Sequence, residues 1–260
     1  MTDRYGQIGF SSQRIRYDWL ERTAQMCLAG MSISAIRHEI QSLLSDLSSS
    51  GSAKRGSREK ATTILLKIWV SPYKELADFR DAGLELLSSV KKEERIAIHW
   101  GMIMAAYPFW ANVASEAGRL IRLQTTVTAQ QVRRRLIEKF GDRELVLRAT
   151  RNVLRSFVNW KVLKETPEKG VYSAGISLTI AQVEVIAWLA EAFLHAHPNG
   201  SVALRTVIDS TSLFPFRLSP VFADHLVAVS GRLDVLRHGL DQDLIMLRTE
   251  SSPVVKESGQ

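Results

Sequence analysis

The sequence has very little cysteine and no recognisable export segment. Its single cysteine, Cys27, excludes an internal disulfide and a cysteine-rich zinc site, and lone cysteines are typically small buried apolar side chains. The first ten residues, Met1 to Phe10, lack the apolar core of a signal peptide. We therefore expect a cytoplasmic protein rather than a secreted one.

Local catalytic motifs are also missing. The sequence contains no glycine-rich phosphate loop, no His-Glu-x-x-His pair and no nucleophile elbow. The nearest metal motif, His195-x-His197, lacks cysteine or acidic partners at metal spacing, so we interpret it as two polar residues closing a helix. We expect no catalytic residues, no metal and no cofactor. The remaining enzymatic alternative is a nuclease whose metal carboxylates are brought together only by the fold.

One run of the sequence is apolar enough to resemble a membrane span. Residues Ile96 to Ala114 carry no Asp, Glu, Lys or Arg, but they include a histidine, a glycine, Pro108 and Asn112, which are unfavourable in lipid. Because proline removes a backbone donor and clashes with the preceding turn, we predict a buried helix broken near Tyr107 and Pro108. No membrane partner is expected.

Helical periodicity dominates the chain, so the sequence predicts a mainly α fold. A Ser/Gly stretch, Ser48 to Ser57, is expected to form a loop. The helices predicted before residue 125 cover Ile15 to Ala29, Ser34 to Leu47, Arg58 to Val70, Tyr73 to Val90, Glu93 to Tyr107 and Phe109 to Gln124.

Positive charge is concentrated in one part of the sequence. Residues Val113 to Glu165 hold 12 Lys or Arg and 5 acids, a net +7, whereas the rest of the chain holds 22 of each sign. A localised cationic surface on a helical unit is typical of polyanion binders, because each cation that meets a phosphate releases counterions. The sequence therefore favours nucleic acid as the partner, and duplex DNA in particular.

This basic region predicts a helix-turn-helix. Thr128 is a plausible N-cap for a helix from Ala129 to Phe140, and Gly141 is suited to its C-terminal end. Asp142 is predicted to cap a second helix from Arg143 to Trp160. The turn between the helices is short enough to set the second across the first.

The second helix divides into two faces. An apolar stripe from Val146 to Trp160 lies opposite Arg148, Arg151 and Arg155, with Asn152 and Asn159 beside the arginines. Arginine can bind guanine edges and asparagine adenine edges, so this face suits a major groove, although the same arginines could bind phosphates alone.

A predicted β-hairpin follows this helix. Two short strands around Leu163 and Tyr172 enclose a Pro/Gly turn, which is typical of a wing, and Lys164 and Lys169 are placed to reach DNA from it. A separate basic cluster, Lys54, Arg55, Arg58 and Lys60, is equally compatible with phosphate contact and with a solvated loop. The full set of candidate DNA-binding residues is Arg133, Arg134, Arg135, Lys139, Arg143, Arg148, Arg151, Asn152, Arg155, Lys164, Lys169, Lys54, Arg55 and Arg58.

The C-terminal third predicts a second unit of related design. A helix from Thr179 to Ala196, capped by Thr179, precedes short helices and a hairpin of Arg232 to His238 with Asp243 to Arg248. Residues Thr179 to Glu250 hold 5 basic and 8 acidic residues, so self-association as a homodimer or partner binding suits this winged-helix-like unit better than DNA. The predicted domains are residues 1–112, 113–175 and 176–250, with a tail at 251–260.

From about Ile64 to Tyr172 the chain carries a series of short motifs, and a basic loop leads into the helix of residues 57–69. The motifs are Ala106-Tyr107-Pro108-Phe109, Gly118-Arg119-Leu120, Gly141-Asp142-Arg143 and Trp160-Lys161-Val162-Leu163. In this order of features the chain resembles the BrxA family of accessory proteins in BREX bacteriophage-defence systems. The resemblance implies a non-catalytic winged-helix DNA-binding subunit of a bacterial restriction and methylation system that works with other defence subunits. The alternative is a protein-interaction scaffold or transcriptional regulator whose basic face binds an acidic partner.

Overall fold

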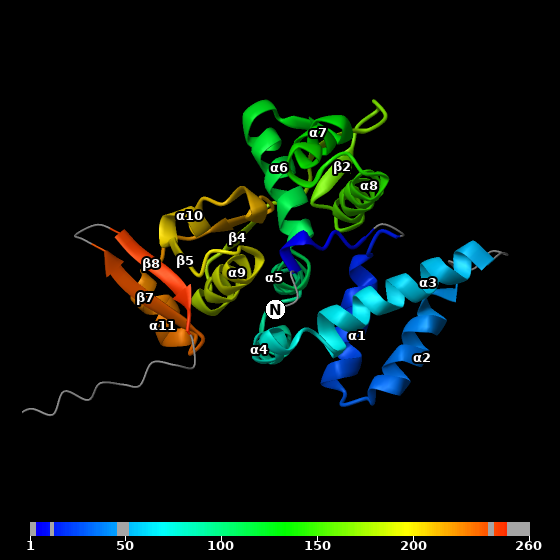
Figure 1. Cartoon of the computed structure of the whole chain (residues 1–260). Helices are drawn as coiled ribbons and strands as arrows, with labels where there is room; N and C mark the ends of the chain where they lie inside the picture. Colours follow the sequence, from blue (N-terminus) through cyan, green and yellow to red (C-terminus); the bar gives the residue numbers. More distant parts are fainter. Residues whose placement is uncertain (1–3, 11–12, 46–51, 239–241, 249–260) are drawn as a thin grey trace, which may run out of the picture.

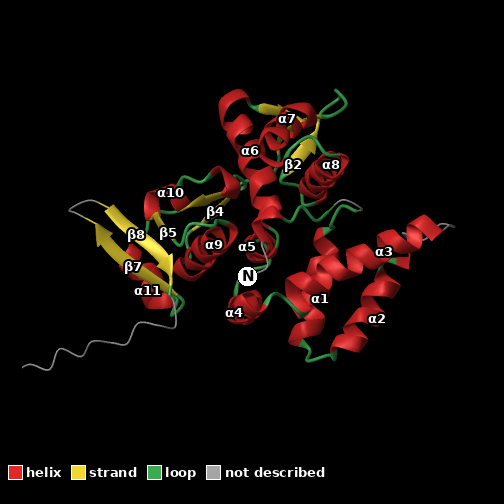
Figure 2. Ribbon diagram, viewed as in Figure 1, coloured by secondary structure: helices red, strands yellow, loops and turns green. Residues whose placement is uncertain are grey.

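The computed structural model describes residues 4–10, 13–45, 52–238 and 242–248. This part of the chain is mainly helical and carries small sheets, which confirms the predicted mainly α class (Figure 2). Figure 1 shows three groups of elements around a central helix, α5: the first three helices on one side, α6 to α8 above, and the last strands on the opposite side.

The first group consists of three helices. They are α1 (Tyr17–Leu28), α2 (Ile33–Leu43) and α3 (Ser52–Leu65), and α3 continues into a π-helical turn, η3 (Leu66–Val70). The loop predicted through residue 57 is wrong from Ser52 onward. Lengthening a helix costs far less than nucleating one, and this stretch contains alanine, lysine and arginine, which are good helix formers.

The central layer is formed by α4 (Ala77–Ser89, after the 3-10 turn η4, Lys74–Leu76), α5 (Arg95–Ala106) and α6 (Pro108–Gln124). Residues 96–106 of α5 are all buried. The helix break predicted at Tyr107 and Pro108 is confirmed, because Pro108 is the first residue of α6. Among the described residues, no helix is both long and apolar enough to cross a bilayer.

After α6 come β1 (Thr126–Thr128), α7 (Ala129–Phe140), α8 (Glu144–Asn159), β2 (Leu163–Glu165) and β3 (Val171–Ala174). The three strands form an antiparallel sheet in the order β1-β3-β2. The predicted hairpin is therefore present, and β1 extends it on the far side of β3. Together with α6, these elements are called the first unit.

The second unit repeats this order. It consists of α9 (Val183–Ala196), β5 (Ser201–Ala203), α10 (Leu204–Ile208), α11 (Ala223–Val229), β7 (Leu233–His238) and β8 (Gln242–Leu247). Its sheet order, β5-β8-β7, matches that of the first unit. The predicted cap at Thr179 is wrong. Thr179 lies in β4 (Leu178–Ile180), which pairs in parallel with β6 (Phe216–Leu218), and Gln182 stands before α9.

An insertion between α10 and α11 joins the two units. Its 3-10 turn, η5 (Thr211–Leu213), packs on α6, where Ser115 and Thr211 share a hydrogen bond of 3.0 Å. The indole of Trp100 in α5 donates to the carbonyl of Ser212 at 3.1 Å. One buried cluster includes residues of all three groups, and the predicted boundary between residues 112 and 113 falls inside α6.

Candidate nucleic-acid interface

The predicted start and end of α7 are confirmed. The hydroxyl of Thr128 accepts from the amide of Gln131 at 3.0 Å, and the side chain of Gln131 accepts from the amide of Thr128 at 2.9 Å, a complete capping box. Gly141 ends the helix with a φ of +81°, which favours glycine. The exposed residues Arg133, Arg134 and Arg135 therefore follow one another on a helix with fixed ends.

The predicted cap of α8 is wrong. Arg143, not Asp142, occupies the N-cap position, and no side chain there bonds to the helix amides. The Arg143 guanidinium instead donates two hydrogen bonds, of 2.8 and 3.2 Å, to the carbonyl of Phe140 in α7. Arg143 thus connects the end of α7 to the start of α8, and its guanidinium stabilises the turn between the two helices.

In α8 the apolar residues are buried and the arginines are exposed, as predicted. Val146, Val153 and Phe157 are fully buried, whereas Arg148, Arg151 and Arg155 are exposed.

The asparagines of α8 do not belong to this exposed surface. Asn152 is only 9% exposed, and its amide donates to the carbonyl of Phe10 at 2.7 Å. Asn159 accepts from the amide of Tyr17 at 2.9 Å. The prediction that Asn152 faces a DNA groove is therefore wrong, because an N-terminal segment covers that side of the helix.

A groove runs between α7 and α8, with a volume of about 870 Å³. Arginines from both helices line it, as do Glu138 and Glu144. The fold thus brings two arginines of each helix to the same groove. They are Arg133 and Arg134 of α7 and Arg148 and Arg151 of α8.

Some of these cations are neutralised within the protein. Glu138 lies 3.8 Å from both Arg134 and Arg135, and Glu144 lies 3.2 Å from Arg148. Within the described part of the chain, three other arginines of this surface make neither a hydrogen bond nor an ion pair, and these are Arg133, Arg151 and Arg155. Their guanidinium donors are free to bind an anion.

The hairpin adds two exposed lysines. Lys164 lies on β2 and Lys169 in the turn, where the hydroxyl of Thr166 bonds to carbonyls at 3.1 and 3.2 Å. Burial and the negative charge of Glu165 raise the pKa of Tyr172 in β3, and the positive charge of Arg155 opposes that rise. The end of the arginine stripe therefore lies beside the hairpin sheet.

Other predicted residues lie elsewhere. Lys139 projects from α7 toward α6, where its ammonium donates to the side chain of Asn112. Arg58 is partly buried in α3, a helix that packs against α1 and α2. Lys54 and Arg55 lie in the first turns of the same helix, and their side chains are outside the described part of the structure. The helix that carries this second basic cluster lies in the first group of elements, apart from α7 and α8 (Figure 1).

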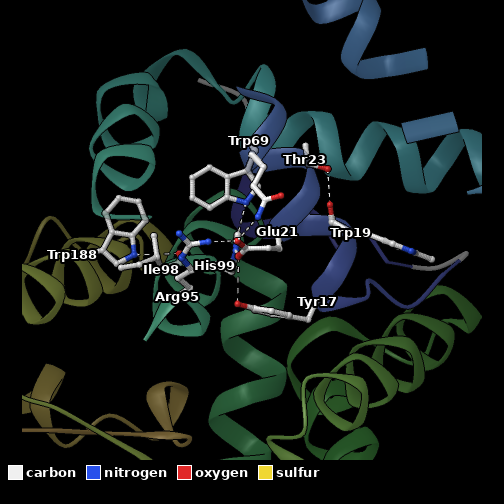
Figure 3. Close-up of polar contacts among 10 residues, drawn as sticks. Tyr17, Trp19, Glu21, Thr23, Trp69, Arg95, Ile98, His99 and Trp188 are labelled. Atoms are coloured by element: carbon white, nitrogen blue, oxygen red, sulfur yellow. Dashed lines mark hydrogen bonds and ion pairs between the residues drawn. The ribbon is translucent and has the colours of Figure 1, made fainter. Parts of the chain in front are cut away.

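A buried polar network lies between α1, η3 and α5 (Figure 3). The indole of Trp69 donates to Nδ1 of His99 at 3.1 Å, so the ring proton is on Nε2, which donates to Glu21 at 2.8 Å. The hydrogen bond from His99, helped by the nearby Arg95, lowers the pKa of Glu21 to about 2 despite burial. Burial lowers the pKa of His99 itself. Each member binds another, as expected of a packing network.

The histidines of the predicted helix end have structural partners. His195 is 3.8 Å from Glu191 and packs on Phe79, while His197 stacks on Phe193 and bonds to its carbonyl at 2.7 Å. Among the described residues, no three His, Cys, Asp or Glu side chains are grouped to hold a metal ion.

In comparisons with known proteins, no family model, no curated protein and no solved structure matched the chain.

Proposed function

We propose that the first unit is a winged helix-turn-helix that binds duplex DNA, with α8 as the helix that enters the major groove. The order α6-β1-α7-α8-β2-β3 supplies a helix pair followed by a hairpin beside the second helix. The observation that carries the proposal is the exposed stripe on α8, where Arg151 and Arg155 have no acidic partner among the residues that the structure describes. An unpaired guanidinium can bind phosphate or a guanine edge without first breaking an ion pair.

The contacts divide between helix and hairpin. Arg148, Arg151 and Arg155 face the base edges in the major groove of the DNA. Arg133 reaches the DNA phosphate backbone from α7. Lys164 and Lys169 contact the backbone from the hairpin. Because most such contacts are with phosphates, they fix position and affinity more than sequence.

The wider role rests on the sequence motifs. The BrxA-like segments favour a non-catalytic accessory subunit of a cytoplasmic bacterial phage-defence system, with other subunits of that system as partners. The second unit, acidic in sequence, is then the surface for self-association or for those subunits.

The test is a binding titration with duplex DNA over a series of salt concentrations. The pair Arg151→Ala and Arg155→Ala should lower the slope of log K against log salt by about two, because each lost phosphate contact removes about one released counterion. Arg205→Ala is the matched control. This arginine is 93% exposed on α10 of the second unit, so its loss should leave the slope unchanged.

Three results would decide against the proposal. They are no retardation of DNA at low salt, a double variant that folds and binds like the parent protein, or preferred binding of an acidic protein in competition with DNA. Single-stranded DNA and RNA as competitors define the class of nucleic acid.

A further inference from the structure

An N-terminal segment lies along α8. The carbonyl of Phe10 accepts from Asn152, and Ile15 both donates to Ser156 at 2.9 Å and accepts from the indole of Trp160 at 3.0 Å. Phe10 and Ile15 are buried. We call the described residues 8–10 and 13–17 the strap. Its backbone is held on α8 by side chains spaced three or four residues apart, so it follows the helix.

The strap and α7 lie on opposite sides of the arginine stripe. Successive residues of a helix are rotated by about 100° around its axis, so each side chain of α8 can be given an angle measured from Glu144. The mean angle of the three arginines, Arg148, Arg151 and Arg155, is about 15°. The mean angle of the strap-binding residues, Asn152, Ser156 and Asn159, is about 70° larger. Leu147 and Thr150, which line the groove beside α7, lie on the other side of the stripe. The exposed arginines are therefore flanked by α7 on one edge and by the strap on the other.

One residue of the strap carries an available charge. Ile15 points inward and Arg14 is exposed, whereas Arg16 is held by Asp18 at 3.1 Å and lies over Trp19. Within the described residues Arg14 has no hydrogen bond and no ion pair. Because both backbone bonds of the next residue are fixed on α8, the position of Arg14 along the helix is set before any ligand arrives. Such preorganisation lowers the ordering cost of binding.

We propose that Arg14 binds a DNA backbone phosphate on the edge of the major groove opposite to the edge bound by Arg133 of α7. This inference rests on the proposed function. A helix about 10–12 Å wide fills a major groove about 12 Å wide, so phosphates of the two strands flank it on both sides. With α7 serving one edge and the strap the other, α8 is clamped between the strands.

The first test compares Arg14→Ala, Arg133→Ala, their combination and the control Arg205→Ala in the full chain. Each of the first two should lower the salt slope by about 0.9, which corresponds to about eightfold weaker binding at 0.1 M salt, and the combination by about twice that. Arg14→Lys should keep the slope, because lysine retains the charge. Thermal unfolding of each variant checks that the strap is still in place.

The second test asks which strand each residue approaches. A DNA-cleaving iron chelate is attached to a cysteine at position 14 or 133 after Cys27→Ala has removed the natural thiol. Cuts should fall on opposite strands across one groove. Cuts on the same strand, or none from position 14 when position 133 cuts, would overturn the proposal.

The two proposals fail differently. If Arg14→Ala keeps the slope of the parent protein while loss of Arg151 and Arg155 lowers it, the strap makes no phosphate contact and the DNA-binding assignment of α8 stands. If the parent protein does not bind duplex DNA, both proposals are wrong.

Discussion

Gly118 lies where the two units meet, and its replacement by alanine tests that joint. The residue is on α6, facing the insertion of the second unit. A Cβ added there would lie closer than 3.0 Å to the carbonyl oxygen of Thr211 and to Cβ of Phe214. Neither atom is the end of a flexible side chain, so Gly118→Ala must move the backbone of η5 away from α6.

The expected cost follows from the bonds that hold η5 and the residue Asp209, just before it, on α5 and α6. Moving η5 weakens the hydrogen bonds of Ser115 with Thr211, of Arg122 with the carbonyl of Asp209, and of Trp100 with the carbonyl of Ser212. At about 1 kcal/mol for each bond, the loss is about 3 kcal/mol. Alanine returns about 1 kcal/mol of helix propensity. The net loss of unfolding free energy is therefore about 2 kcal/mol, or a Tm lower by about 4–8 °C in a chain of this size.

Urea unfolding measures this loss as a lower midpoint at constant m. Gly56→Ala is the matched control, because Gly56 also lies in a helix, α3, and no described atom comes within 4 Å of an added Cβ. That variant should gain up to about 1 kcal/mol. If Gly118→Ala is stabilised to the same degree as Gly56→Ala, the close approach of η5 to α6 does not exist and the reasoning is refuted.

Three further predictions concern the groove and the core. Glu144→Gln should tighten DNA binding and steepen the salt slope by up to about one, because it removes the carboxylate 3.2 Å from Arg148; an unchanged slope in the salt titration would contradict the groove assignment. Asn152→Ala should cost about 1–3 kcal/mol of unfolding free energy in urea by removing the partner of a buried strap carbonyl; a loss of base preference in a stable variant would return Asn152 to the DNA surface. Acid should destabilise the fold, because folding lowers the pKa values of both His99 and Glu21. The contribution of His99 to the unfolding free energy is complete above pH 6.5 and is lost as the pH falls below that value. The contribution of Glu21 is complete above pH 4.5 and is lost between pH 4.5 and about 2. Urea unfolding at pH 7.5, 5.5 and 4 measures the decline, and equal stability at pH 7.5 and 5.5 would show that His99 is not buried as a neutral ring.

The features that the sequence predicted correctly are those decided by neighbouring residues. The start of α7 follows from Thr128 and Gln131, which satisfy each other's backbone groups, and its end follows from Gly141. The break at Pro108 follows from a missing amide hydrogen. The buried stripe and the exposed arginines of α8 follow from helical geometry and hydrophobicity alone.

Two of the errors occur where a distant part of the chain decides. Asn152 is a polar residue next to an arginine stripe, and only the strap, 142 residues away in sequence, buries it. Thr179 belongs to β4, which forms only because it pairs with β6, a strand far away in sequence. No local sequence signal predicts this pairing, so the sequence alone indicates a helix cap at Thr179. The error at the start of α8 is local instead: Arg143 takes the position predicted for Asp142, and its long side chain reaches back to the carbonyl of Phe140, three residues earlier.

The two units share a fold but differ in how their arginines are paired. Both have the same element order and sheet order, yet the second unit joins most of its arginines to carboxylates. Arg232 makes bonds of 2.7 and 3.0 Å to the buried Glu191, and Arg237 lies between Asp224 and Asp243.

A guanidinium bound in this way must lose one anion before it can bind another. Replacing Asp224 and Asp243 together by asparagine should therefore free Arg237 and give the second unit a weak, salt-dependent affinity for DNA, measured in a chain whose α8 arginines are replaced by alanine. If that chain still does not bind DNA at low salt, an unpaired arginine alone is not sufficient for DNA binding. The binding property of the first unit would then depend on the strap and on the geometry of α7 and α8 as well as on its free arginines.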